Sequence, residues 1–114
     1  MSHITTHVLD TSLGRPARAV PVMLEFQTPT SDWQVLGKGV TDADGRLRDL
    51  LPPELELQPG NYRLTFDTGT YFTMHNLEGF YPEVSVSFSI RDKSQHFHVP
   101  LLLSPFGYST YRGS

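Results

Sequence analysis

The sequence predicts a single all-β sandwich domain that spans residues 1–114 and carries one short helix. Three observations support this prediction. About eight short runs alternate apolar and polar side chains, as half-buried strands do. Clusters of Gly, Pro, Asp and Ser separate these runs, and only one segment has apolar residues at helix-like spacing. Many short strands with turn signals between them favour a sandwich over an α/β arrangement.

The first two thirds of the chain contain five of the expected strands. In the first of them Val8 belongs to the apolar face, so His7 stands on the opposite face. Gly37 and Gly39 predict a bulge or the close approach of another backbone. Residues 42–45, Asp-Ala-Asp-Gly, predict a tight turn that delivers Arg46 onto a short strand. The five strands are expected at residues 4–9, 20–27, 33–40, 46–48 and 62–67, and residues 54–59 as a loop or a short extended segment.

The last third contains the expected helix and three more strands. The helix is expected over residues 70–79, about two turns long and ended by a glycine at position 79. Residues 84–90 alternate serines with apolar side chains, which is typical of a strand with one exposed face. In the run 96–103, Phe97 and Val99 lie on the apolar face, which places His96 and His98 together on the other face. Residues 104–107 predict a turn, and a final strand follows over residues 108–112.

Composition excludes several classes of function. The net charge of −3 and the absence of a block of basic residues make nucleic acid and acidic membranes poor partners. The chain has no cysteine, so it uses neither disulfides nor thiolate metal ligands, as is common in a reducing compartment. Neither a positively charged leader nor an apolar run long enough to span a bilayer is present. We therefore expect a soluble cytoplasmic protein.

Four features carry candidate chemistry. The imidazoles of His7 and His98 titrate near pH ~6.5 when unperturbed, so either can act as a base near neutral pH. Arg46 offers a permanent cation with several hydrogen-bond donors. At the end of the chain, Ser114 is expected to place a free carboxylate on the fold, where it would orient one histidine. These residues suit the addition of water to a carbonyl group, and the sequence does not rank the two histidines.

The polar residues also admit two other interpretations. His96 and His98 are two residues apart on one face and could be two of three metal ligands, the third being His7 or His3. The serines of residues 84–90 fit the exposed face of a strand, and no glycine-rich elbow surrounds any of them. A covalent serine mechanism is therefore not expected.

Five motifs are spread along the whole chain: Thr-His-Val-Leu-Asp at 6–10, Asp-Gly-Arg at 44–46, Tyr-Arg-Leu at 62–64, the histidine pair followed by Val-Pro-Leu-Leu-Leu-Ser-Pro at 99–105, and Tyr-Arg-Gly-Ser at 111–114. Together they resemble the motifs of the 5-hydroxyisourate hydrolases, the transthyretin-related enzymes of urate catabolism. The resemblance implies a transthyretin-like sandwich of two four-stranded sheets. It also implies a homotetramer, in which dimers joined through their last strands stack and enclose the active sites.

The resemblance implies hydrolysis of 5-hydroxyisourate to 2-oxo-4-hydroxy-4-carboxy-5-ureidoimidazoline, with no metal or organic cofactor. We expect His98 to activate water and His7 to orient the substrate or to shuttle a proton. A transthyretin-like carrier, which would need an apolar channel, and a secreted structural sandwich domain are the alternatives. By motif position, the residues implied as catalytic are His7, Arg46 and His98, and those implied as substrate-binding are His96, Tyr111, Arg112, Gly113 and Ser114.

Overall fold

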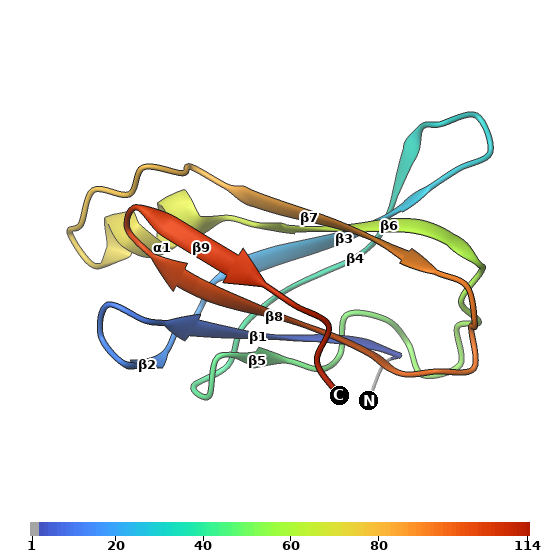
Figure 1. Ribbon diagram of the computed structural model, residues 1–114, viewed down its shortest axis with the longest axis horizontal. Helices are drawn as coiled ribbons and strands as arrows, with labels where there is room; N and C mark the ends of the chain where they lie inside the picture. The colour runs from blue at the N-terminus through green and yellow to red at the C-terminus, as the bar shows by residue number, and fades with distance from the viewer. Residues whose placement is uncertain (1–2) are drawn as a thin grey trace.

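The computed structural model describes residues 3–114, which form two sheets packed face to face (Figure 1). One sheet has the order β2 (Arg15–Pro16), β1 (Ile4–Asp10), β8 (Phe97–Ser104) and β9 (Gly107–Thr110), with β5 (Arg46–Leu47) also paired to β1. The other has the order β4 (Trp33–Val40), β3 (Pro21–Gln27), β6 (Gly60–Phe66) and β7 (Val84–Ile90). A single helix, α1 (Thr68–Met74), follows β6. The predicted all-β sandwich with one short helix is confirmed.

The core lies between the inner faces of the two sheets. In β8 the alternating residues at 97, 99, 101 and 103 are buried, as their apolar pattern predicts. The facing strands supply matching apolar side chains, which include Val22, Leu24, Leu64 and Phe66. Consequently His98, which alternates with the buried residues at 97 and 99, is turned away from the core. Within residues 3–114, no helix has the length and apolar character needed to cross a membrane.

The number of strands differs from the expectation of two four-stranded sheets. The sheet that holds β1 has five strands, because the two-residue strands β2 and β5 both pair with β1. β2 is not among the strands predicted from the sequence, since a pair of residues is too short to show an alternating pattern. The expected bulge is confirmed, because the pairing of β3 with β4 shifts register between Leu24 and Glu25. Gly37, on the bulged strand, lies against the carbonyl group of Leu50, where a Cβ would not fit.

The helix occupies Thr68–Met74, so the expected span of 70–79 is wrong at both ends. Asp67 caps its start, because the carboxylate accepts the N–H of Thr70 at 3.1 Å. Asn76 adopts a φ of 55° after the last turn, and the N–H of Leu77 donates to the carbonyl of Phe72 at 2.9 Å. This is a Schellman ending built on asparagine, the residue that most often replaces glycine there. Gly79 lies beyond it, against the ring of Phe72.

A buried carboxylate ties the end of β1 to α1. Asp10 is 1% exposed and accepts the Tyr71 hydroxyl at 2.7 Å. It also accepts the hydroxyl and N–H of Ser12 and the N–H of Leu13. Burial alone would raise the pKa of Asp10, but these hydrogen bonds outweigh it and lower the pKa below 3.8. The ionised carboxylate therefore stabilises the fold.

Replacing Tyr71 by Phe should lower the free energy of unfolding by about 1.5–3 kcal/mol at pH 7, because a donor to a charged acceptor is lost. The folded-state pKa of Asp10 lies below its unfolded value of 3.8, so its stabilisation is complete above that pH and is lost as the pH falls through the folded-state pKa. Urea unfolding of wild type and Tyr71→Phe between neutral and acid pH measures the difference in their free energies of unfolding. This difference should become smaller in acid.

The matched control is Tyr62→Phe. The Tyr62 hydroxyl donates to the carbonyl of Gln58 at 2.6 Å, so its loss involves no carboxylate. The stability difference caused by Tyr62→Phe should stay constant over the same acid range. A difference for Tyr71→Phe that is equally independent of pH would contradict the assignment of an ionised Asp10.

Candidate active site

Three neighbouring strands bring the polar residues of the site together. β1 runs parallel to β8, and the register places Thr5 beside His98. On its other edge β1 pairs with β5, which places His7 beside Arg46. Residues directly opposite each other in a sheet point to the same face. Residues separated by up to 93 positions in the sequence therefore share the outer face of this sheet.

The turn before β5 holds the backbone of Arg46 in place. The carboxylate of Asp42 accepts the N–H of Asp44 at 2.8 Å and that of Arg46 at 3.0 Å. Gly45 has a φ of 74°, which favours glycine, and its carbonyl accepts the N–H of Val8 at 2.7 Å. The predicted tight turn is therefore present, and it fastens Arg46 to β1 through backbone contacts alone. The guanidinium group of Arg46 lines the cavity described below.

His7 is oriented by a backbone carbonyl. Its Nε2 lies 2.8 Å from the carbonyl oxygen of Asp44. A carbonyl only accepts, so Nε2 of His7 carries the proton and donates it. The nitrogen that remains as a base in neutral His7 is thus Nδ1. The residue is half-buried and pairs with Arg46, but it is not one of the residues that line the cavity described below.

His98 is held by a side chain that the sequence analysis did not single out. The hydroxyl oxygen of Thr5 lies 2.8 Å from Nδ1 of His98 and 3.0 Å from Nε2 of His96. Thr5 is only 4% exposed, His98 is half-buried and His96 is exposed. Among residues 3–114, no hydrogen bond reaches Nε2 of His98 or joins Ser114 to a histidine. The orienting contact expected of Ser114 is therefore made by Thr5.

Burial lowers the pKa of His98 below 6.5, and the nearby positive charge of Arg46 lowers it further, followed by the neighbouring histidines. His98 is consequently neutral at pH 7. A neutral imidazole whose Nδ1–H donates to the Thr5 hydroxyl has an unprotonated Nε2 that accepts a proton.

The cavity at this face has a volume of about 270 Å³. Its lining is polar and combines two guanidinium groups with two imidazoles, which suits a small planar ligand rich in carbonyl and N–H groups. The residues that line it are Thr5, Thr6, Arg46, Arg48, His96, His98 and Ser114. Four expected site residues therefore meet here, and Thr5, Thr6 and Arg48 join them.

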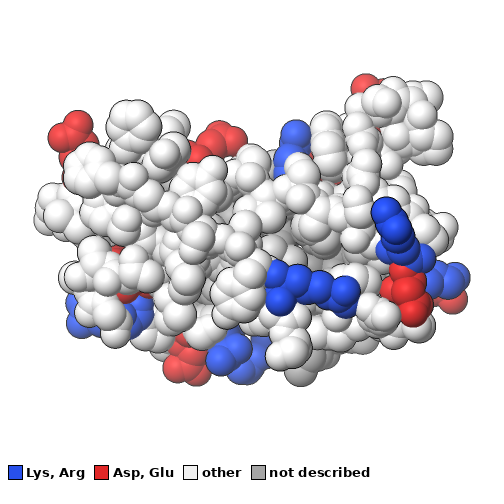
Figure 2. All heavy atoms as spheres, in the orientation of Figure 1, with Lys and Arg blue, Asp and Glu red and all other residues white. Residues whose placement is uncertain are grey.

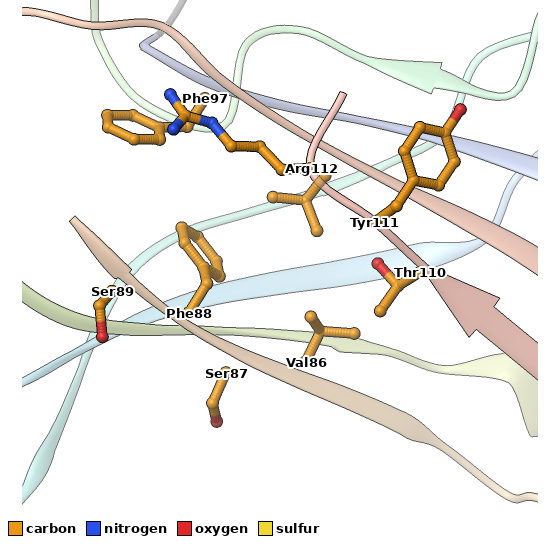
Figure 3. A pocket seen from close by; sticks show the side chains of 9 residues that line it. Val86, Ser87, Phe88, Ser89, Phe97, Thr110, Tyr111 and Arg112 are labelled. Atoms are coloured by element: carbon orange, nitrogen blue, oxygen red, sulfur yellow. The ribbon is translucent and has the colours of Figure 1, made fainter. Parts of the chain in front are cut away.

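The terminal tetrapeptide is divided between two places. Gly113 forms a β-bridge with His98, donating its N–H to the His98 carbonyl at 2.8 Å. A Cβ at Gly113 would meet the His98 ring at 2.6 Å, so glycine is required there for a close approach. Tyr111 and Arg112 instead line a separate hollow between β7, β8 and the segment after β9 (Figure 3). In this chain these two side chains do not share the cavity of His98.

Arg112 is held in that hollow by two contacts. Its guanidinium lies 4.8 Å from the centre of the Phe97 ring and donates to the side-chain oxygen of Gln95 at 2.6 Å. Figure 3 shows the side chain extended toward Phe97, with Tyr111 turned to the other side.

A metal site built on His96 and His98 would need a third ligand, and the described residues place none beside them. No group of three or more His, Cys, Asp or Glu side chains within residues 3–114 is placed to hold a metal ion. His3 lines a different hollow, together with residues 53–57. His96 and His98 are joined through the Thr5 hydroxyl instead.

Known proteins resemble this chain along nearly its whole length. The family model described as "HIUase/Transthyretin family" matches residues 4–113. A 5-hydroxyisourate hydrolase of Salmonella typhimurium is 49% identical over 111 residues, which are 97% of this chain and 80% of that protein. The solved 5-hydroxyisourate hydrolase of Klebsiella pneumoniae is 38% identical, with a TM-score of 0.86 and complete coverage of both chains.

A protein solved with a bound small molecule also has this fold. Sea bream transthyretin, solved in complex with thyroxine, is 32% identical with a TM-score of 0.90, over 96% of this chain and 93% of that one. Sequence and structure thus point to the same group of proteins, and the chain belongs to the HIUase/Transthyretin family.

Proposed function

We propose that this chain hydrolyses 5-hydroxyisourate to 2-oxo-4-hydroxy-4-carboxy-5-ureidoimidazoline, a step in urate degradation. The observation that carries the proposal is the polar cavity in which a neutral His98 and the cation of Arg46 lie on one face. The relatives from Salmonella typhimurium and Klebsiella pneumoniae that bear the name of this enzyme support it. The reaction needs a base for water, a cation for the developing oxyanion and donors that orient the ring.

In this mechanism Nε2 of His98 takes a proton from water while the water oxygen attacks a ring carbonyl. The negative charge that forms on the carbonyl oxygen is stabilised by Arg46. Collapse of the tetrahedral intermediate breaks the ring C–N bond, and the leaving nitrogen receives a proton. His7 orients the substrate or shuttles a proton through its free Nδ1. His96, Gly113 and Ser114 border the cavity and shape the place where the ring binds.

Self-association into a homotetramer is part of the proposal. β7 and β9 are edge strands of their sheets, and unpaired edges favour pairing with another chain. Figure 2 shows a mostly uncharged surface over β7 and β9. Four large apolar side chains near these edges are strongly exposed, namely Phe80, Phe106, Tyr108 and Tyr111. Tyr111 and Arg112 would then act on substrate from the interface between protomers, and sedimentation equilibrium measures the assembly.

The likeness to sea bream transthyretin makes a carrier the second candidate function. A carrier of a hydrophobic molecule needs an apolar, adaptable lining. The cavity beside β1 has two arginines and two histidines instead, which favours chemistry over passive binding. A cytoplasmic location stays a prediction of the sequence.

The experiment that separates the two functions follows the ultraviolet absorbance of freshly generated 5-hydroxyisourate. The protein should accelerate the decay at catalytic concentration, and a chelator should leave the acceleration unchanged. Circular dichroism on the same sample checks that the protein is folded. A folded protein that gives no acceleration would contradict the hydrolase and favour the carrier.

A further inference from the structure

The Thr5 hydroxyl stands between two histidine rings. It lies 2.8 Å from Nδ1 of His98 and 3.0 Å from Nε2 of His96, and both distances are those of hydrogen bonds. The register of β1 with β8 sets this position, because Thr5 is the direct partner of His98. Thr5 is only 4% exposed, so water has little access to either contact.

A single hydroxyl couples the protons of the two rings. It carries one proton, so it donates to one ring nitrogen and accepts from the other. When His98 has its proton on Nδ1 and donates it to Thr5, Thr5 donates to an unprotonated Nε2 of His96. In the reverse arrangement Thr5 donates to Nδ1 of His98, so His98 carries its proton on Nε2 and has no unprotonated nitrogen there to accept one from water.

We propose that Thr5 is a positioning residue that holds His98 in the Nδ1–H form and relays a proton between His98 and His96 during hydrolysis. The proposal rests on the hydrolysis proposed above for this cavity. It gives His96, which borders the cavity, a defined part in the reaction.

The relay balances without a further reactant. Nε2 of His98 takes a proton from water as the hydroxide adds to the carbonyl carbon. The proton on Nδ1 of His98 passes to the Thr5 oxygen, and the former hydroxyl proton of Thr5 passes to Nε2 of His96. His98 is then neutral with its proton on Nε2, and His96 is an imidazolium. When Nε2 of His98 protonates the leaving nitrogen, the shift through Thr5 reverses and restores the starting forms.

The positions of the rings favour this direction of transfer. A charge that stayed on half-buried His98 would lie near Arg46, whereas His96 is exposed to water. Water stabilises the imidazolium of His96 better than the cavity stabilises that of His98. The relay therefore moves the positive charge out of the cavity while the oxyanion remains beside Arg46.

Thr5→Val removes the hydroxyl and keeps the β-branched shape, and Thr5→Ser keeps the hydroxyl. We expect Thr5→Val to lower kcat about tenfold to a hundredfold with KM within about twofold, since the base loses its orienting partner. Thr5→Ser should restore kcat. In ¹⁵N spectra of histidine-labelled protein, wild type and Thr5→Ser should show His98 as the Nδ1–H form, and Thr5→Val a mixture of both forms.

His96→Asn tests the far end of the relay. This variant by itself should lower kcat. The kcat of the double variant with Thr5→Val should be no lower than that of the more impaired single variant. Multiplied losses would overturn the relay. An unchanged His98 spectrum in Thr5→Val, or a Thr5→Ser variant as slow as Thr5→Val, would overturn the positioning role.

Thr68→Val is the matched control. Thr68 is fully buried, and its hydroxyl donates to the carbonyl of Tyr81 at 2.8 Å, away from the cavity. This variant should lose stability and keep kcat. If Thr5→Val fails to fold, the kinetics and ¹⁵N spectrum of His96→Asn decide the proposal. The spectra need no substrate, so they test the hold of Thr5 on His98 even if 5-hydroxyisourate is not turned over.

Discussion

His98→Asn is expected to lower kcat by about two to four orders of magnitude, the usual contribution of a positioned general base. Asparagine is close to imidazole in reach and can keep a hydrogen bond to Thr5, but its amide does not accept a proton near neutral pH. KM should change far less than kcat, because the proposed role of His98 is to act on water in the transition state. Steady-state decay of 5-hydroxyisourate measures both constants.

His75→Asn is the control for that variant. His75 lies at the end of α1, exposed and bonded to the carbonyl of Tyr71, so its replacement should leave turnover unchanged. His7→Asn should reduce turnover less than His98→Asn, since Nε2 of His7 is committed to the carbonyl of Asp44. A His98→Asn protein with wild-type turnover would remove His98 from the role of base.

Arg46→Gln is expected to lower kcat by about two to three orders of magnitude, as the loss of one oxyanion donor does in other hydrolases. The variant should fold, because Asp42 and β1 hold residue 46 through its backbone. Arg46→Lys keeps the charge and loses the planar fork, so it should recover part of the rate. Comparing kcat for the three proteins separates the contribution of charge from that of geometry.

Arg91→Gln makes the same chemical change at an exposed position after β7 and should leave kcat unchanged. Equal rates for wild type and Arg46→Gln would show that the oxyanion is stabilised elsewhere in the cavity. Arg48 would then be the residue to replace, since it is the other guanidinium in the lining.

Much of the fold follows from the pattern of side chains. The alternation in β8 is sufficient to place His98 on the polar face, because the pleat of a strand leaves no other choice once Phe97 and Val99 are buried. The turn before Arg46 was predictable for a similar reason, since Asp at 42 and Gly at 45 supply the side-chain acceptor and the positive φ that it needs.

What the sequence could not show depends on pairing between distant segments. Nothing in the run of residues 4–9 distinguishes Thr5 from its neighbours, and its role appears only when β1 lies parallel to β8 in a particular register. The same holds for Arg48, which reaches the cavity through the pairing of β5. β2 could not be predicted because two residues are too few to show an alternation of apolar and polar side chains. The predicted end of the helix was wrong because Asn76, and not Gly79, adopts the positive φ that ends it.

The placement of the terminal tetrapeptide also depended on such contacts. Motif position grouped Tyr111 and Arg112 with the residues beside His98, but β9 ends at Thr110 and only Gly113 pairs again with β8. Successive residues in an extended chain point to opposite sides, so the four side chains do not enter one cavity of this chain. Their part in substrate binding stays a prediction.

The most direct test of the account is the pH dependence of kcat/KM, which reports the ionisation of the free enzyme. Because burial and the charges around it lower the pKa of His98, the activity should fall in acid only below pH 6.5, and His98→Asn should lose that limb of the profile. A limb that persists unchanged in His98→Asn, or one centred above 6.5 in the wild type, would contradict a neutral His98 as the base that activates water.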